Sequence, residues 1–220
     1  MTTLRLKLTL RSDATFGRGE GVAGLVDEEV EHDANGLPYL RGRTLKGLLV
    51  EECANLLYAL RQQNSDTTLW HAAADRLFGQ SGMRPGQMRI SAAQLPQDLQ
   101  AVVQYEVERN NLSRVDVLES LTDLRRQTAM DETGRPEAGS LRTLRVILRE
   151  TIFEATLCFQ SEPQDLDLSL LSACVLALRR AGLGRNRGRG HLQARLFDEA
   201  GQQDVTQIYF KQFSQKLEVQ

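Results

Sequence analysis

Hydrophobic and polar residues alternate strictly near the start of the chain. The leucines at even positions from Leu4 to Leu10 share one side of an extended segment, and Arg5, Lys7, Thr9 and Arg11 share the other. This period of two predicts a half-buried strand with one core face and one basic face. The same alternation returns over 153–159 and 191–196, and a strand over 88–95 is expected after Gly86.

Other segments have helical spacing. Apolar residues from Leu45 to Leu60 form one stripe, which predicts a helix that begins at Arg43 or Thr44 and runs to about Arg61. A shorter helix is expected over 69–78. A third is expected over 168–181, because its apolar positions are followed by Arg179, Arg180 and Gly182, a typical C-terminal sequence.

The elements follow the order strand, helix, strand, polar insertion, strand, helix, strand. This order predicts an α+β protein with a ferredoxin-like (RRM-like) βαββαβ core, in which helices cover one face of an antiparallel sheet. We expect a single domain over residues 1–220, with insertions at about 12–42 and about 98–142. The first is an acidic, glycine-containing loop and the second is polar. Long insertions on a small scaffold commonly carry function.

Composition narrows the functional classes. The net charge of −2 and the pI near 6.0 argue against a protein wrapped in nucleic acid on all sides, but they allow one basic face. No apolar stretch approaches the roughly 18 to 20 residues that cross a bilayer, so a cytoplasmic protein without a membrane partner is expected. The cysteines and histidines are scattered, which argues against a zinc site.

The segment Gly182–Gly190 contains four glycines and three arginines. Glycine lets a ligand approach the backbone, and arginine supplies a permanent forked cation, so the segment is a candidate anion cradle. A flexible surface hairpin with solvated charges is the alternative. A second candidate is the predicted helix start at Arg43, Thr44 and Lys46, where unpaired N–H groups favour a phosphate. There the alternative is that Thr44 only caps the helix and Lys46 is solvated.

Four separated motifs then occur in one order: Gly36–Gly47 at the first helix, Leu77–Gly79 before a strand led by Gly86, Thr128–Gly134, and Gly182–Gly190. Together they resemble the RAMP superfamily, specifically the backbone subunit that polymerises along the guide RNA in type III CRISPR effector complexes. In that family the third motif belongs to a thumb-like hairpin, and the fourth is a glycine-rich loop.

The resemblance implies a guide CRISPR RNA as a bound component, gripped through its backbone while base pairing reads the sequence. In the thumb, Met130 would be a wedge between bases, and the alternative is an ordinary hairpin with a buried methionine. The RNA-binding residues implied in this way are Arg41, Arg43, Thr44, Lys46, Arg125, Arg126, Met130, Gly184, Arg185, Arg187, Gly188, Arg189 and Gly190.

The resemblance also implies where chemistry would occur. The run Gly24–Asp33 resembles the family stretch whose first aspartate cuts target RNA, and Asp27 matches that aspartate. Cleavage would need a divalent cation, with Mg²⁺ expected, and would use the ribose 2′-hydroxyl beside the scissile phosphate. No metal ligand is assigned. The other acids of the run, Glu28, Glu29, Glu31 and Asp33, are expected to be solvated at the surface.

The leading hypothesis is therefore a guide-RNA-binding backbone subunit that also acts as a target-RNA endoribonuclease when assembled. Its expected partners are the guide RNA, the target RNA, further copies of itself and other type III subunits. Three alternatives remain open. They are a catalytically inactive architectural subunit, a guide-precursor-processing ribonuclease of the same superfamily, and an RNA-binding module outside CRISPR.

Overall fold

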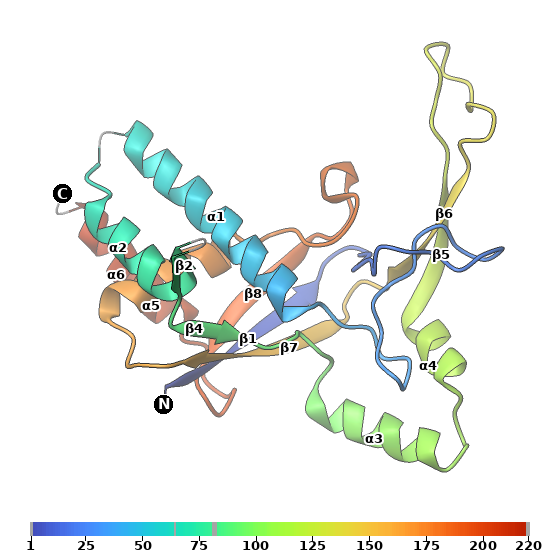
Figure 1. Ribbon diagram of the computed structural model, residues 1–220, viewed down its shortest axis with the longest axis horizontal. Coiled ribbons are helices and arrows are strands. Elements are labelled where there is room, and N and C mark those ends of the chain that lie inside the picture. The colour runs from blue at the N-terminus through green and yellow to red at the C-terminus, as the bar shows by residue number, and fades with distance from the viewer. Residues whose placement is uncertain (1, 64, 81–82, 219–220) are drawn as a thin grey trace.

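A four-stranded antiparallel sheet forms the centre of the computed structural model, which describes residues 2–63, 65–80 and 83–218 (Figure 1). Its strands lie in the order β4-β7-β1-β8, with β1 paired to β7 on one side and to β8 on the other. The bounds are β1 Thr3–Leu10, β4 Met88–Ile90, β7 Ile152–Phe159 and β8 Leu192–Phe197. Leu6 pairs with Ala155 and Leu8 with Ala194, so each of these leucines has an alanine on one neighbouring strand.

The two faces of this sheet differ as the alternation predicts. The even-numbered leucines of β1 are buried, while Arg5 and Lys7 between them are half-exposed on the opposite face. In β8 the same pattern leaves Arg195 half-exposed and buries Ala194. The predicted basic face of the strand is therefore present.

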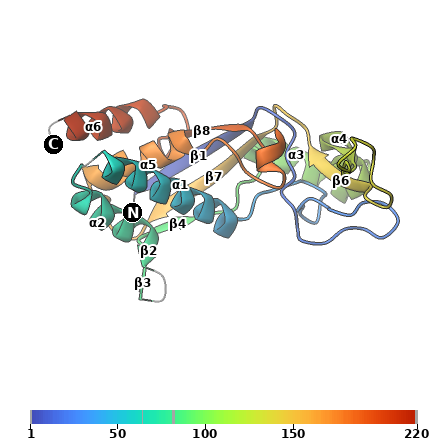
Figure 2. The ribbon, with the colours of Figure 1, turned by 90° about the horizontal axis from the view of Figure 1, so that it is seen from above.

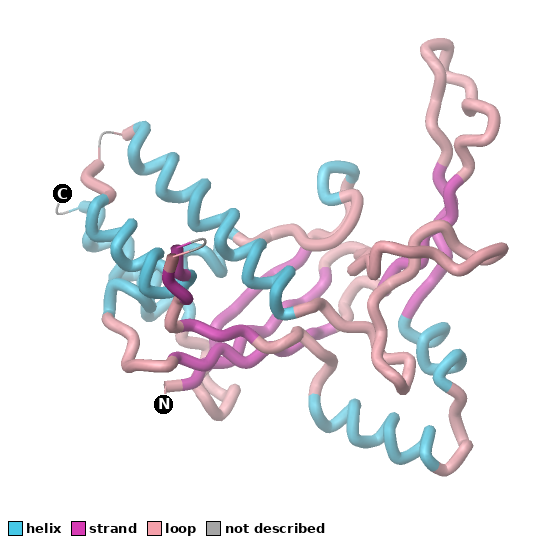
Figure 3. Tube along the Cα trace, in the orientation of Figure 1, coloured by secondary structure: helices cyan, strands magenta, loops and turns pink. Residues whose placement is uncertain are grey.

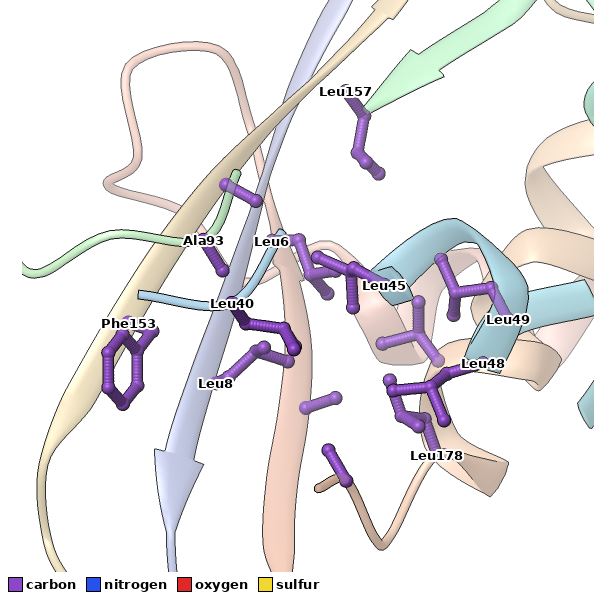
Figure 4. Packing of buried hydrophobic residues seen from close by; sticks show 14 of the residues in the cluster. Leu6, Leu8, Leu40, Leu45, Leu48, Leu49, Ala93, Phe153, Leu157 and Leu178 are labelled. Atoms are coloured by element: carbon purple, nitrogen blue, oxygen red, sulfur yellow. The ribbon is translucent and has the colours of Figure 1, made fainter. Parts of the chain in front are cut away.

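Helices pack against the apolar face. They are α1 (Gly42–Gln62), α2 (Thr68–Phe78), α5 (Asp165–Ala177) and α6 (Thr206–Glu218). Leu45 and Leu49 of α1 meet Leu6 and Leu8 of β1 in one apolar cluster (Figure 4). α5 packs against the other three helices and against β8, which explains why apolar residues occur on nearly all of its sides.

Helix boundaries differ from those expected. The first helix begins at Gly42, before Thr44. The helix expected over 168–181 is α5, which starts earlier because Gln164 and Asp167 form a capping box. It also ends earlier, since the Ala181 N–H donates to the Gly190 carbonyl and draws the following segment into an extended pairing.

The second insertion contains helices that the sequence pattern did not reveal. α3 (Gln97–Glu108) and α4 (Arg114–Leu121) precede a hairpin of β5 (Thr122–Gln127) and β6 (Arg142–Ile147). The amphipathic signal is weak because α3 buries only Val103. The hairpin projects away from the sheet, and its tip is loop (Figures 1 and 3). Two short strands, β2 (Gly79–Gln80) and β3 (Arg84–Pro85), form a separate pair.

The strand expected over 88–95 is shorter than predicted. β4 ends at Ile90, and the chain then forms isolated bridges from Ala93 to Leu40 and from Gln94 to Glu154. Within residues 2–63, 65–80 and 83–218, no helix has the length and hydropathy needed to cross a membrane.

The first insertion, residues 12–42, is a loop that runs from the end of the sheet and passes alongside the hairpin (Figure 2). Single bridges join Ala14 to Ile147 and Glu28 to Leu144 of β6. A loop of this length with long-range backbone pairing supports the interpretation that it serves a function.

Candidate nucleic-acid interface

The glycine loop, residues 182–190, is clamped at both ends to the start of the first insertion. The Leu183 N–H donates to the Thr15 carbonyl at 2.9 Å, and the Gly190 N–H donates to the Asp13 carbonyl at 2.8 Å. Gly190 has φ +68°, and a Cβ there would lie 1.9 Å from the Ala181 oxygen. Glycine is therefore required at this position to let the loop close on its own chain.

The middle of the loop points outward. Arg185–Arg187 form one 3₁₀ turn, flanked by Gly184 and Gly188 in the left-handed conformation. Arg185 forms an ion pair with Glu51 of α1 at 3.0 Å, whereas Arg187 and Arg189 have no ion-pair partner among the residues that the structure describes. The loop therefore presents two guanidinium groups that are available to an anion.

A groove separates the glycine loop from the hairpin. It encloses about 630 Å³ and is lined by Arg142 of β6, by Arg185, Arg187 and Arg189 of the loop, and by one carboxylate, Glu28. A second cavity of about 600 Å³ follows the hairpin arms and shares Arg142 and Arg187 with the first. A third, of about 260 Å³, extends toward α1 and shares Arg185. The three cavities adjoin through these shared residues and are together named the arginine groove.

The start of α1 closes one end of the arginine groove. Arg41 and Thr44 line the 260 Å³ cavity, while Arg43 and Lys46 do not. Gly42 lies against β4, since a Cβ there would be 2.4 Å from the Ile90 oxygen. Arg41 is the N-cap and its side chain makes no capping bond, so the idea that Thr44 caps the helix is wrong.

Arg41 is held by a carboxylate. Its guanidinium lies 2.7 Å from Glu31, and the Tyr39 hydroxyl donates to the same carboxylate at 2.9 Å. Partial burial acts to raise the pKa of Glu31, but the hydrogen bonds from Arg41 and Tyr39 outweigh it and hold that pKa below its ordinary value. Glu31 therefore stays ionised and fixes the direction in which Arg41 points.

The hairpin residues differ in their availability. Arg125 is paired with Asp13 at 3.1 Å and with Asp123, whereas Arg126 is exposed on the same strand. Met130 is 64% exposed near the tip, so the alternative of a buried methionine is wrong. The tip is shaped by Asp131, which accepts the N–H groups of residues 133 and 135.

Asp27 lies beside β6, near the end of the β5–β6 strand pair that leads into the hairpin tip. Its N–H donates to the Thr143 carbonyl at 2.8 Å, and its Oδ2 accepts the Thr143 N–H at 2.7 Å. The residue is exposed, and within the described chain its Oδ1 accepts no hydrogen bond. The carboxylate is thus fixed through one oxygen and open through the other.

The neighbouring acids are not all solvated, contrary to expectation. Glu29 is 2% exposed and pairs with Arg145 of β6 at 2.8 Å, while Arg145 also donates to the Thr122 hydroxyl. Glu28 lines the arginine groove, and Asp33 accepts two backbone N–H groups of its own turn. The buried Glu29–Arg145 pair joins the loop that carries Asp27 to the hairpin.

The residues around Asp27 could hold a divalent cation only if bound RNA and water supplied most of its ligands. In the described ranges no three His, Cys, Asp or Glu side chains lie together as a metal cage. Mg²⁺ commonly binds through one or two carboxylates, several waters and substrate phosphates. The open oxygen of Asp27 could contribute one such ligand, with RNA and water supplying the others.

The sequence did not predict the long-range contacts that hold Asp27 and Glu29. Asp27 and Thr143 are 116 residues apart, and the contact uses the backbone of Thr143, so no residue type signals it. Arg145 likewise lies in an apolar strand where a charge has no periodic signature. The one sequence feature that suggests a buried ion pair here is a charged residue between apolar residues of a strand, because a buried charge requires a partner.

The fold and the site define an α+β protein that carries an arginine-rich groove beside a projecting hairpin. Residues 7–193 match the RAMP superfamily, and the chain belongs to that family. No curated protein matches the sequence.

Two solved structures resemble the chain. A chain of the type III-B Cmr-β complex bound to cognate target RNA has 12% identity and a TM-score of 0.63. That match covers 89% of this chain and 97% of the other. A chain of the apo state of the type III-B Cmr-β complex gives a TM-score of 0.60 at 12% identity, with the same coverage. This likeness shows a shared fold.

Proposed function

We propose that this RAMP protein is a guide-RNA-binding backbone subunit of a type III CRISPR complex. The observation that carries the proposal is the arginine groove, which runs from the hairpin past the glycine loop to the start of α1. In this proposal the sheet order β4-β7-β1-β8 is the ferredoxin-like core and the β5–β6 hairpin is the thumb.

The groove is suited to a backbone rather than to bases. Arg142, Arg187 and Arg189 contribute forked donors that match phosphate geometry, and none of them has an ion-pair partner in the described chain. Aromatic residues line only the 260 Å³ cavity, as Phe16 and Tyr39, so the two larger cavities beside the hairpin and the glycine loop do not provide the stacking used by many single-strand binders. Such a groove would accept any guide sequence and leave target recognition to base pairing.

We further propose that Asp27 takes part in cutting the paired target. The Thr143 backbone holds one carboxylate oxygen, so the other keeps a constant position relative to the hairpin. That oxygen could either accept the proton of the attacking ribose 2′-hydroxyl or act as a ligand of Mg²⁺. A bound Mg²⁺ would supply charge stabilisation at the scissile phosphate.

Guide binding is tested by sequencing the RNA that copurifies with the protein from its native host. The proposal predicts RNA species of defined length that carry CRISPR repeat sequence, together with other subunits of the complex. Copurified RNA of random length and origin would instead favour a general RNA-binding module.

Catalysis is tested with Asp27→Asn in complexes assembled on guide RNA. Target cutting should be abolished while assembly and target binding persist, since an amide keeps the size but cannot take up the proton. Glu20→Gln, an exposed acid in the same loop, is the matched control and should cut normally. Cutting by Asp27→Asn at the wild-type rate would identify an architectural subunit or another catalytic group.

A further inference from the structure

A second cationic cavity lies at the edge of the sheet, outside the arginine groove. It encloses about 350 Å³ beside β8, and its lining includes three arginines, Arg11, Arg179 and Arg195, together with His191. No aspartate or glutamate lines it. In the described chain none of the three arginines forms an ion pair, although Arg11 donates to the side-chain oxygen of Gln193.

A backbone donor from the edge strand adds to this cavity. The N–H groups of Leu192 and Leu196 point away from β1, toward the Arg179 carbonyl and the Thr206 hydroxyl. Backbone groups in an antiparallel strand alternate between its two sides, so the N–H of Ala194 points the same way. Ala194 lines the cavity, and in the described residues its outward N–H has no partner.

The edge is too short for an added strand. Leu192 and Leu196 on either side of Ala194 already bond to this chain, so one residue of β8 remains open. Binding by strand addition would need several consecutive open backbone groups. A compact anion needs only one N–H and converging cations, which are the features present.

We propose that this cavity, formed by Arg11, Arg179, Arg195 and the Ala194 N–H, binds a phosphate group. Its volume is within the range of small-ligand pockets and suits one nucleotide unit. The phosphate could belong to a free nucleotide or to an RNA strand. His191, which lines the cavity, directly follows the glycine loop in the sequence, so the cavity adjoins the C-terminal end of that loop.

The test uses the full-length chain, freed of nucleic acid, in titrations with inorganic phosphate, AMP and a single-stranded oligoribonucleotide. The variant Arg179→Gln/Arg195→Gln should weaken binding of at least one phosphate-bearing probe by tenfold or more. Arg11→Gln should weaken it by a smaller factor. Arg109→Gln, at an exposed arginine just after α3 that lines neither this cavity nor the arginine groove, is the control and should leave binding of all three probes unchanged. Thermal unfolding checks that each variant is folded.

The probes separate the two sources of phosphate. Loss of AMP binding with unchanged RNA binding supports a nucleotide site, and loss of RNA binding alone supports a contact with an RNA backbone. Equal affinity of the double variant and the wild type for all three probes would overturn the proposal. It would also be overturned if an acidic peptide such as deca-glutamate bound through these arginines more tightly than any phosphate probe.

Discussion

The two insertions are both rich in polar residues, but they differ in how they are held. Residues 12–42 are docked against the hairpin base by backbone bridges and by the buried Glu29–Arg145 pair. The hairpin tip, residues 128–141, is exposed nearly throughout and is held by local contacts around Asp131. A polar composition therefore does not determine whether a segment is fixed or projecting, because the partner lies elsewhere in the chain.

This difference matches the two roles that we propose. A reacting carboxylate needs a fixed position, and the docked loop provides one for Asp27. A wedge needs reach, and the exposed Met130 on a projecting hairpin provides it. In this proposal the docked loop fixes the position of Asp27, and the projecting tip carries Met130 to the RNA.

The largest effect is expected from breaking the buried ion pair. Arg145→Met would leave Glu29 charged without its partner, which should lower the free energy of unfolding by about 3–5 kcal/mol. Urea denaturation measures this value. Arg142→Met on the same strand, where the side chain is exposed, is the control and should change stability by less than about 0.5 kcal/mol. Similar small losses for both variants would show that the docking does not depend on the pair.

A smaller effect is expected where the glycine loop is anchored to the first insertion. Gly190→Ala would place a Cβ against the Ala181 carbonyl at positive φ. We therefore expect the free energy of unfolding to fall by about 1–3 kcal/mol. Gly188→Ala has a similar φ of +80° but open space around its Cβ position, so it should lose less. Thermal unfolding compares the two variants. Equal losses of stability would show that the contact between position 190 and the Ala181 carbonyl does not add to the cost of the substitution.

Acidification should weaken the docked loop through Glu31. Because its pKa is lowered in the folded protein, its stabilisation is complete above the ordinary carboxyl pKa of about 4.3 and is lost as the pH falls through the lower folded value. Glu31→Gln should therefore show a shallower decline of stability with falling pH in that window. Identical pH profiles by denaturant unfolding would argue against the Arg41–Glu31 contact.

The smallest effect on stability is expected at the free tip. Met130→Ala should change the free energy of unfolding by less than about 0.5 kcal/mol, since the side chain is exposed. In assembled complexes the same variant should alter target cutting, because the proposed wedge is lost. A large loss of stability would show that the tip is packed, and unchanged cutting would remove the wedge role.

Much of the central sheet was predictable from local pattern. The leucine alternation of β1 and the stripe of α1 identify their buried faces, because each face is set by spacing along one element. The helix α3 was not predicted, because it buries only Val103 and therefore has no clear apolar stripe. The end of α5 was predicted too late, because Ala181 pairs with Gly190 in an extended conformation. At the end of α5 a tertiary contact thus overrides the local helix preference.

The candidate site was predictable only in part. The glycine loop and the helix start were indicated by their composition, and the structure brings Arg185 and Thr44 to one cavity. The burial of Glu29 was not indicated, because an acid in an acidic run has no distinguishing pattern. Its partner Arg145 lies in a strand that is remote in sequence.

The central claim is that the arginine groove holds an RNA backbone. The most direct test measures the affinity of single-stranded RNA against salt concentration for the wild type and for Arg142→Gln/Arg187→Gln. Two lost phosphate contacts should weaken binding and reduce the slope of log affinity against log salt by about 1.4, at about 0.7 per phosphate. An unchanged affinity and slope would contradict the account.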